Sequence, residues 1–200
     1  MARRAGWLLV AVACALPLAK IGFDFARGGL GANPIETALN RLGFWTLVLL
    51  LASLLPSALQ IVFGWAWLIP HRRLIGLFAF FYAALHLATY VGLDQFFDMP
   101  AILEDVVKRK FITVGFVAFL LLVPLAVTSN GLAVRRLGFE RWKLIHRLTY
   151  VAAILGVVHF VWRVKADLQR PLLFAAVLAV LLGVRVVDSW RRRRPAHEIE

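Results

Sequence analysis

Cysteine is almost absent from this chain of 200 residues, which contains only Cys14. A single cysteine cannot form an intrachain disulfide, a CxxC redox motif or the thiolate set of an iron–sulfur cluster. The phosphate-binding patterns GxGxxG and GxxxxGKS/T are also missing, and the stretches between apolar segments are shorter than a βαβ unit of about 30 residues. These absences exclude a complete NAD(P)H-dependent reductase, and any metal ion would need histidine or oxygen ligands.

Charged residues are scarce as well, at 17% of the chain against 62% hydrophobic residues, and the mean hydropathy is +0.80. The charges cluster between long apolar runs, so lipid must solvate these runs and a water-soluble protein is excluded. The formal net charge is +12. This charge does not indicate nucleic-acid binding, because the basic residues flank the apolar segments as the positive-inside rule predicts.

The apolar segments predict an all-α integral membrane protein, a six-transmembrane-helix bundle that forms a single domain over residues 1–200. A hydrocarbon core about 30 Å thick takes roughly 20 helical residues to cross. We expect spans at residues 7–25, 42–63, 74–93, 111–130, 144–162 and 171–187.

An even number of spans places both termini on one side of the membrane, and basic residues identify this side as the cytoplasm. The residues on this side are Arg3, Arg4, Arg72, Arg73, Arg135, Arg136, Arg141, Lys143, Arg147, Arg185 and Arg191 to Arg194. A signal peptide is the alternative interpretation of the first span, since Arg3 and Arg4 precede an apolar stretch. The predicted topology argues against it.

Two patterns predict where helices begin on the outer side. Asn33-Pro34-Ile35-Glu36 places an N-cap residue, a proline and a glutamate just before the second span. Asp98-Met99-Pro100 repeats this pattern and predicts a short interfacial helix that ends near Lys108.

Two histidines lie deep within predicted spans, where ionisable side chains are costly unless they bind or pair. At 1.5 Å of rise per residue, His86 lies about 18 Å and His159 about 22 Å from the cytoplasmic ends of their helices. Two imidazoles at similar depth suit a haem clamped between two helices. Zinc would need more ligands than the span interiors offer. Hydrogen bonding between helices is the alternative role for these histidines.

A second metal site is less well supported. His146 precedes His159 by 13 residues, but Arg72 stands where a partner for His146 would be expected on the third span. His146 with Arg72 and Arg73 could instead bind haem propionates, a flavin phosphate or a quinone carbonyl. We expect two other histidines, His71 and His197, to be solvated beside the membrane. Cys14 is expected to be a small packing residue.

Short motifs between about Gly22 and Val187 form a specific combination, although each is weak alone. They are Gly31-Ala32-Asn33-Pro34, Arg72-Arg73-Leu74-Ile75-Gly76-Leu77, Leu85-His86-Leu87, Lys108-Arg109-Lys110-Phe111-Ile112-Thr113-Val114-Gly115, Thr128-Ser129, Trp142-Lys143-Leu144-Ile145-His146-Arg147-Leu148-Thr149-Tyr150 and His159-Phe160-Val161-Trp162. Together they resemble the MsrQ (YedZ) family, the haem-binding membrane subunits of the bacterial periplasmic methionine sulfoxide reductase system. More distantly, the chain resembles the ferric reductase-like transmembrane domain of NADPH oxidases and the six-transmembrane epithelial antigens of the prostate.

This resemblance implies a b-type haem electron-transfer subunit in the bacterial inner membrane, with histidine ligands among His86, His146 and His159. One haem is implied, and a second is left open because Arg72 replaces the oxidase-type inner ligand. The resemblance also implies electrons from the quinone pool or a cytosolic flavin reductase, with FMN or a quinone as further cofactors. The electrons would leave to a periplasmic molybdopterin-containing methionine sulfoxide reductase catalytic subunit, for repair of oxidised proteins.

A small membrane transporter or an assembly scaffold with structural histidines is the alternative function. Under the electron-transfer hypothesis, a cytoplasmic basic belt is the side where electrons arrive. It consists of Arg72, Arg73, Arg141, Lys143 and Arg147. The outer loop from Asp94 to Lys110, with Arg163 and Lys165, is expected to dock the soluble acceptor.

Overall fold

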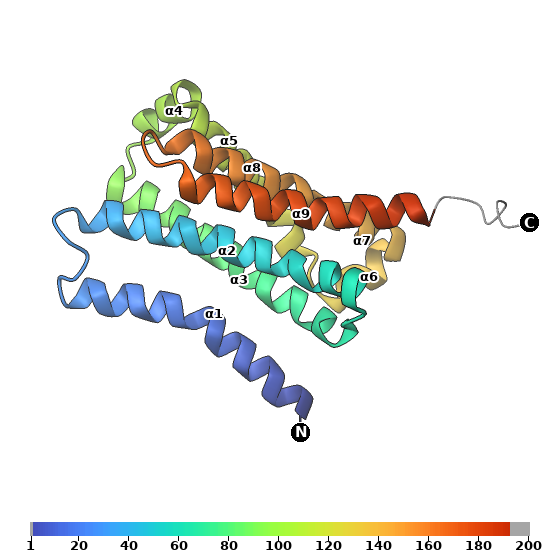
Figure 1. The fold of residues 1–200 in the computed structure, drawn as a ribbon. Helices are drawn as coiled ribbons and strands as arrows, with labels where there is room; N and C mark the ends of the chain where they lie inside the picture. Colours follow the sequence, from blue (N-terminus) through green and yellow to red (C-terminus); the bar gives the residue numbers. More distant parts are fainter. Residues whose placement is uncertain (1, 193–200) are drawn as a thin grey trace, which may run out of the picture.

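The computed structural model describes residues 2–192, with side chains from residue 5 onward. The helices are α1 (Ala2–Ala26), α2 (Pro34–Phe63), α3 (Arg72–Thr89), α4 (Met99–Lys108), α5 (Lys110–Val127), α6 (Gly131–Leu137), α7 (Phe139–His146), α8 (Leu148–Arg163) and α9 (Gln169–Arg191), as Figure 1 shows. A 3₁₀ segment, η1 (Ala66–His71), precedes α3, and a π-helical segment, η2 (Tyr90–Asp94), follows it. Arg193, Arg194 and His197 lie outside the described residues.

Six helical segments within residues 2–192 are long and apolar enough to cross a membrane, which confirms the predicted bundle. They are Ala5–Ala26, Pro34–Phe63, Ala66–Asp94, Lys110–Val127, Phe139–Arg163 and Gln169–Arg191. The fifth segment consists of two helices, α7 and α8, which meet at Arg147. The fourth ends at Val127, and Asn130 caps the separate helix α6 by accepting a bond from the Ala133 N–H.

Both predicted outer helix starts are present. The side-chain oxygen of Asn33 accepts a hydrogen bond from the Glu36 N–H at 3.1 Å, and Pro34 begins α2. Asp98 accepts from the Ala101 N–H at 3.1 Å and caps α4, which ends at Lys108 as expected. Figure 1 shows that α1 begins and α9 ends at one end of the bundle, here called the terminal end, and that α4 lies at the other, the α4 end.

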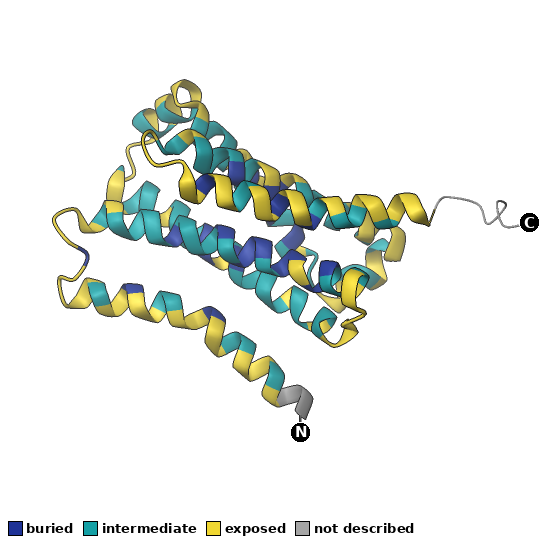
Figure 2. Ribbon diagram, viewed as in Figure 1, coloured by how far each residue is buried: buried dark blue, intermediate teal, exposed yellow. Residues whose placement is uncertain are grey.

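Two antiparallel helix pairs, α2 with α3 and α5 with α8, form the body of the bundle, and α9 packs on α2 and α8. Figure 2 shows that the buried residues gather in the middle of α2 and on the faces turned toward it. The outward faces carry exposed large apolar side chains, such as Leu9, Phe81 and Val180. Such faces suit contact with lipid.

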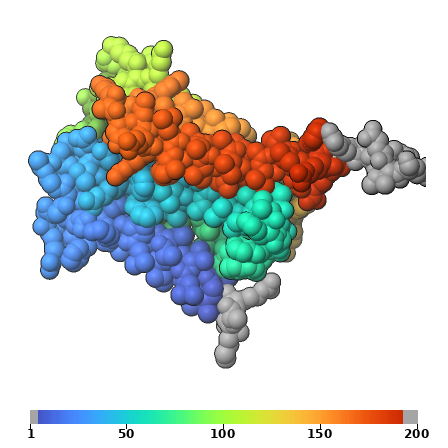
Figure 3. All heavy atoms as spheres, viewed as in Figure 1, coloured from blue at the N-terminus to red at the C-terminus, as the bar shows by residue number. Residues whose placement is uncertain are grey.

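Helix α1 lies along one edge of the molecule, against α2 and α3 (Figure 3). Pro17 lies inside α1, and next to it the Tyr82 hydroxyl from α3 enters the helix ladder. This hydroxyl donates to the Cys14 carbonyl and accepts from the Leu18 N–H, both at 2.8 Å. A side chain inserted into the ladder is a recognised cause of helix bending. Cys14 is only 5% exposed, which confirms its packing role.

Candidate functional site

A cavity of about 630 Å³ lies between α2, α3, α5 and α8, with α4 along its rim. Its volume falls within the range of about 300–1,000 Å³ that is typical of cofactor and ligand sites. Apolar side chains make up most of its wall, among them Leu47, Leu50 and Phe119. His86 and His159 both line it, so the structure brings together the two histidines that span depth singled out.

The two imidazole rings lie close together, one on α3 and the other on α8. Their centroids are 6.3 Å apart and their planes are inclined by 80°. Imidazole nitrogens bind metal ions at about 2.0–2.1 Å, and a ring centroid lies roughly 1.2 Å behind its nitrogen, so two rings sharing one ion would have centroids about 6.4 Å apart. The observed separation therefore has the size that a single metal ion between the rings requires.

Backbone carbonyls fix both rings. The Nδ1 atom of His86 is 3.0 Å from the Leu39 oxygen of α2, and the Nδ1 atom of His159 is 2.7 Å from the Phe111 oxygen of α5. A carbonyl only accepts, so each Nδ1 carries the proton and each Nε2 keeps its lone pair. Metal-binding histidines are oriented in this way, with the non-ligating nitrogen donating to a neighbour.

Two glycines make room for the rings. A Cβ atom on Gly43 of α2 would lie 3.2 Å from Cε1 of His86, and a Cβ on Gly115 of α5 would lie only 2.5 Å from Nδ1 of His159. Real Cβ contacts are essentially never as short as the second distance, so His159 requires glycine at that position.

The same arrangement of a backbone carbonyl, a glycine and a histidine occurs twice in the site. Leu39 precedes Gly43 by four residues, as Phe111 precedes Gly115, and each set lies on the helix that faces its histidine. This correspondence cannot be recognised in the sequence alone, because the histidines follow 43 and 44 residues after their glycines. The only sign of it in the sequence is a glycine near the outer end of the span that precedes each histidine-bearing span.

The ligand chemistry favours an ion that already has other donors. No group of three or more His, Cys, Asp or Glu residues that could hold a metal ion occurs among residues 2–192. Two neutral imidazoles therefore do not make a zinc site, which takes three or four protein ligands. They do suit the iron of a haem, whose porphyrin supplies the remaining donors and fills an apolar slot.

His146 lies apart from this pair and does not line the cavity. Its ring stacks on Trp142 at 4.1 Å, and its Nε2 atom is 3.1 Å from the Thr128 hydroxyl. Arg72, at the start of α3, is close enough for its charge to act on His146. The Arg72 Nε atom is buried, and no hydrogen-bond partner for it occurs in the described chain. Arg73 is exposed.

The expectation that His71 is solvated is wrong. His71 is partly buried, its ring lies 6.0 Å from that of Trp7, and its buried Nδ1 atom has no hydrogen-bond partner within residues 2–192. The reason is that η1 brings His71 under the first turns of α1, close to Gly6. Position beside a span end does not show which neighbouring helix covers a residue.

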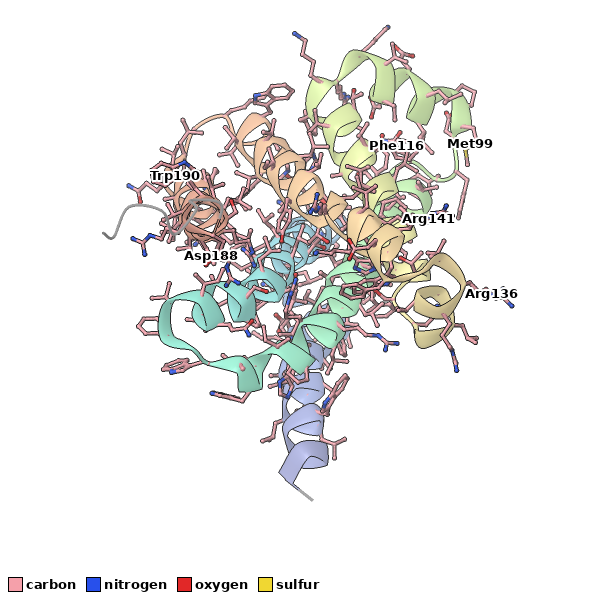
Figure 4. The ribbon with its side chains drawn as sticks, turned by 90° about the vertical axis from the view of Figure 1, so that its right-hand side faces the viewer. Met99, Phe116, Arg136, Arg141, Asp188 and Trp190 are labelled. Carbon is pink, nitrogen blue, oxygen red and sulfur yellow. The ribbon has the colours of Figure 1, made fainter. Side chains whose placement is uncertain are left out.

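The basic belt at the terminal end is exposed except for Arg72. Figure 4 looks onto this end and shows Arg136 and Arg141, on α6 and α7, on the side opposite Asp188 and Trp190 of α9. Arg141, Lys143 and Arg147 are all exposed. Only Arg72 of the belt is partly buried, which makes it the member best placed to contact something inside the bundle.

At the α4 end, several of the predicted docking residues already have partners. Asp105 accepts a hydrogen bond from the Tyr90 hydroxyl at 2.9 Å and pairs with Arg109 at 2.9 Å. Glu104 pairs with Lys108 at 2.5 Å, and both side chains are exposed. Asp98 caps α4, whereas Glu104 and Lys108 contact each other only across one turn of that helix.

Comparison with known proteins gives consistent matches. Residues 42–157 match the family described as "Ferric reductase like transmembrane component". That range includes Gly43, His86, Gly115 and His146 and ends two residues before His159.

Three relatives illustrate the similarity over the whole chain. A protein of Rhodospirillum rubrum is 56% identical over 96% of this chain and 92% of its own length. A protein of Herminiimonas arsenicoxydans is 48% identical over 91% and 84%, and one of Deinococcus radiodurans is 45% identical over 92% and 90%. Each is named "Protein-methionine-sulfoxide reductase heme-binding subunit MsrQ".

Proposed function

Because this chain belongs to the MsrQ family of ferric reductase-like transmembrane proteins, we propose that it binds a b-type haem between His86 and His159 and relays electrons through it. The observation that carries the proposal is the pair of imidazoles across an apolar cavity, each with its Nδ1 proton held by a carbonyl of the neighbouring helix. The names of the relatives, which include haem binding, agree with it.

The bound haem would supply a one-electron ferric and ferrous couple, and the chain would tune that couple. The Leu39 and Phe111 carbonyls hold the proton on each Nδ1 and so increase the basicity of each Nε2, which favours the ferric state. The apolar wall of the cavity would exclude water from the iron. His86 and His159 would both bind the iron, so the site would transfer electrons and leave no position for a substrate.

The direction of transfer follows from the proposed topology in a bacterial inner membrane with both termini in the cytoplasm. The exposed arginines and lysine at the terminal end support this orientation by the positive-inside rule. The His86–His159 site lies toward the α4 end, because α4 forms the rim of the cavity. Electrons would therefore leave on the periplasmic side, to a molybdopterin-containing methionine sulfoxide reductase catalytic subunit.

Electrons would arrive at the terminal end, from the quinone pool or from a cytosolic flavin reductase. The partly buried Arg72, whose Nε atom has no partner in the described chain, and the neighbouring His146 are the residues we propose to contact a quinone carbonyl, an FMN phosphate or the propionates of a second haem. Arg72→Lys keeps the charge and loses the planar fork. We expect this variant to slow reduction by the donor, whereas Arg73→Lys, an exposed control, should not.

Spectroscopy of the purified full-length protein tests the haem assignment. The expected result is a Soret band and, in the reduced-minus-oxidised difference, an α-band in the b-type region. His86→Ala and His159→Ala should each abolish the low-spin spectrum, because no third histidine lines the cavity. A colourless protein from haem-replete cells would contradict the proposal and favour a transporter or scaffold with structural histidines.

A further inference from the structure

A second feature of the cavity is an arginine that has no partner among the described residues. Arg163 follows His159 by four residues on α8, so both side chains lie on the same face of that helix. Arg163 lines the cavity and is partly buried. Among residues 2–192 no ion pair or hydrogen bond engages its guanidinium group. It shares the cavity wall with both imidazoles.

A second arginine, Arg109, lines the cavity from the junction of α4 and α5. Its Nε atom is held by Asp105 at 2.9 Å, and Asp105 is held in turn by the Tyr90 hydroxyl. A guanidinium has five N–H donors, so this pair leaves the two terminal nitrogens of Arg109 available. Asp105 thus orients Arg109 and leaves N–H donors of its guanidinium free to bind a ligand.

Two carboxylates also lie on the cavity wall, and neither pairs with these arginines in the described chain. Glu36 accepts a hydrogen bond from the Asn33 side-chain amide at 3.2 Å, and Asp94 accepts one from the Gln95 amide at 3.1 Å. The rim therefore presents arginine donors that no carboxylate within residues 2–192 fully satisfies. The partly buried guanidinium of Arg163 is costly to leave in this state, which favours an anionic ligand.

The cavity consequently has an apolar interior with two imidazoles and a rim with two arginines. The complementary ligand is a flat apolar molecule with carboxylates along one edge. We propose, on the basis of the haem function argued above, that Arg163 and Arg109 bind the two porphyrin carboxylates and orient that edge toward the α4 end. The guanidinium fork matches carboxylate geometry, and each charge-assisted bond adds affinity that iron ligation alone does not provide.

Esterifying the carboxylates of haem and replacing the arginines that bind them should both speed dissociation of the ligand. The full-length protein in detergent is loaded with haem or with haem dimethyl ester, and transfer to excess apomyoglobin gives each dissociation rate. We expect the ester to leave the unaltered protein about tenfold faster than haem. In Arg163→Gln, haem itself should leave about tenfold faster, and the ratio of the ester rate to the haem rate should shrink toward one.

Matched controls separate this role from general charge. Lys165→Gln and Lys110→Gln remove neighbouring positive charges that do not line the cavity, and both should keep the difference between haem and ester. Arg109→Gln should reduce the difference in part. Arg163→Lys keeps the charge, and its haem dissociation rate should fall between those of the unaltered protein and Arg163→Gln. This variant replaces Arg163→Gln in the test if the glutamine variant does not fold.

The outcomes distinguish this inference from the function on which it rests. If neither haem nor ester gives a low-spin spectrum in the unaltered protein, the haem site itself is refuted. If both bind with a low-spin spectrum and leave at equal rates, the haem site stands and the carboxylate pairing is overturned. The pairing is likewise overturned if Arg163→Gln keeps the full difference between haem and ester.

Discussion

At the scale of single residues, His86 and His159 depend on groups that side-chain replacement cannot remove, namely the carbonyl oxygens of Leu39 and Phe111. The two facing glycines are therefore the accessible means of disturbing the rings. They differ in tightness, since a Cβ would come within 2.5 Å of His159 at Gly115 but only within 3.2 Å of His86 at Gly43. The two halves of the site should respond unequally to the same substitution.

Gly115→Ala is expected to displace the His159 ring and to lower haem occupancy strongly, because overpacking of this kind costs about 1–3 kcal/mol and breaks the bond to Phe111. Gly43→Ala should cause a smaller loss. The ratio of Soret to protein absorbance measures occupancy. Gly183→Ala in α9, where a Cβ would meet nothing within 4 Å, is the control and should leave occupancy unchanged. Equal occupancy in the Gly115 and Gly183 variants would refute the steric role.

His146→Ala tests whether the histidine at the terminal end binds metal. In the structure its Nε2 atom faces Thr128, and it does not share the cavity of His86 and His159. We expect the low-spin spectrum of the His86–His159 haem to survive, with the haem-to-protein ratio equal to that of the unaltered chain. A ratio halved by the substitution would show instead that His146 holds a second haem.

Features that depend on position along a single helix could be predicted from the sequence, whereas contacts between two helices could not. Counting helical rise gave His86 and His159 similar depth, and the structure brings their rings together. The same counting could not reveal the carbonyls and glycines, which lie on other helices. The expectation that His71 is solvated rested on its position beside a span end, and it was wrong because α1 covers that residue through a contact with Trp7.

At the scale of elements, α1 is attached to the bundle by an unusual contact. The Tyr82 hydroxyl occupies the place of the ladder bond between the Cys14 carbonyl and the Leu18 N–H. Tyr82 is fully buried, so its removal would leave these two groups without their partner. Pro17 already lacks an N–H, and the helix has little remaining capacity to tolerate another lost bond there.

Tyr82→Phe is therefore expected to lower thermal stability in detergent, with a cost of about 1–3 kcal/mol for two buried groups left unpaired. Tyr90→Phe is the comparison, since it loses a single bond to Asp105 at the α4 end and should cost less. Unfolding midpoints of both variants, followed by circular dichroism, test this. A Tyr82→Phe midpoint equal to that of the unaltered protein would mean that α1 straightens and restores its own ladder bond.

Element boundaries illustrate what local patterns can predict. The caps at Asn33 and Asp98 are signalled by residues within four positions, and both are present. The break at Arg147 between α7 and α8 had no such signal, because neither glycine nor proline lies there. Hydropathy records that residues 139–163 can cross a membrane, but it does not report whether the helix is continuous.

At the scale of the whole molecule, the bundle separates a basic terminal end from an α4 end that carries charges of both signs. The haem site proposed between α3 and α8 lies toward the α4 end, so an acceptor that docks there would be close to the cavity rim. Reversing Asp98 or Asp105 would not test docking cleanly. These residues cap α4 and hold Tyr90 and Arg109, and their loss would disturb the rim itself.

Glu104 offers a cleaner test of docking at the α4 end, because its side chain is 60% exposed and its ion pair with Lys108 is a surface pair of small energetic value. If the acceptor binds this surface, Glu104→Lys should slow electron delivery to the periplasmic partner roughly two- to tenfold at low salt, and the deficit should vanish as salt screens the charges. Haem spectra should not change. Glu140→Lys makes the same reversal on α7 at the terminal end and should deliver electrons normally to that partner. Delivery that is unaffected in Glu104→Lys, or slowed equally at every salt concentration, would place the docking surface elsewhere, since a charge in or near the contact changes the association rate in a way that salt screens.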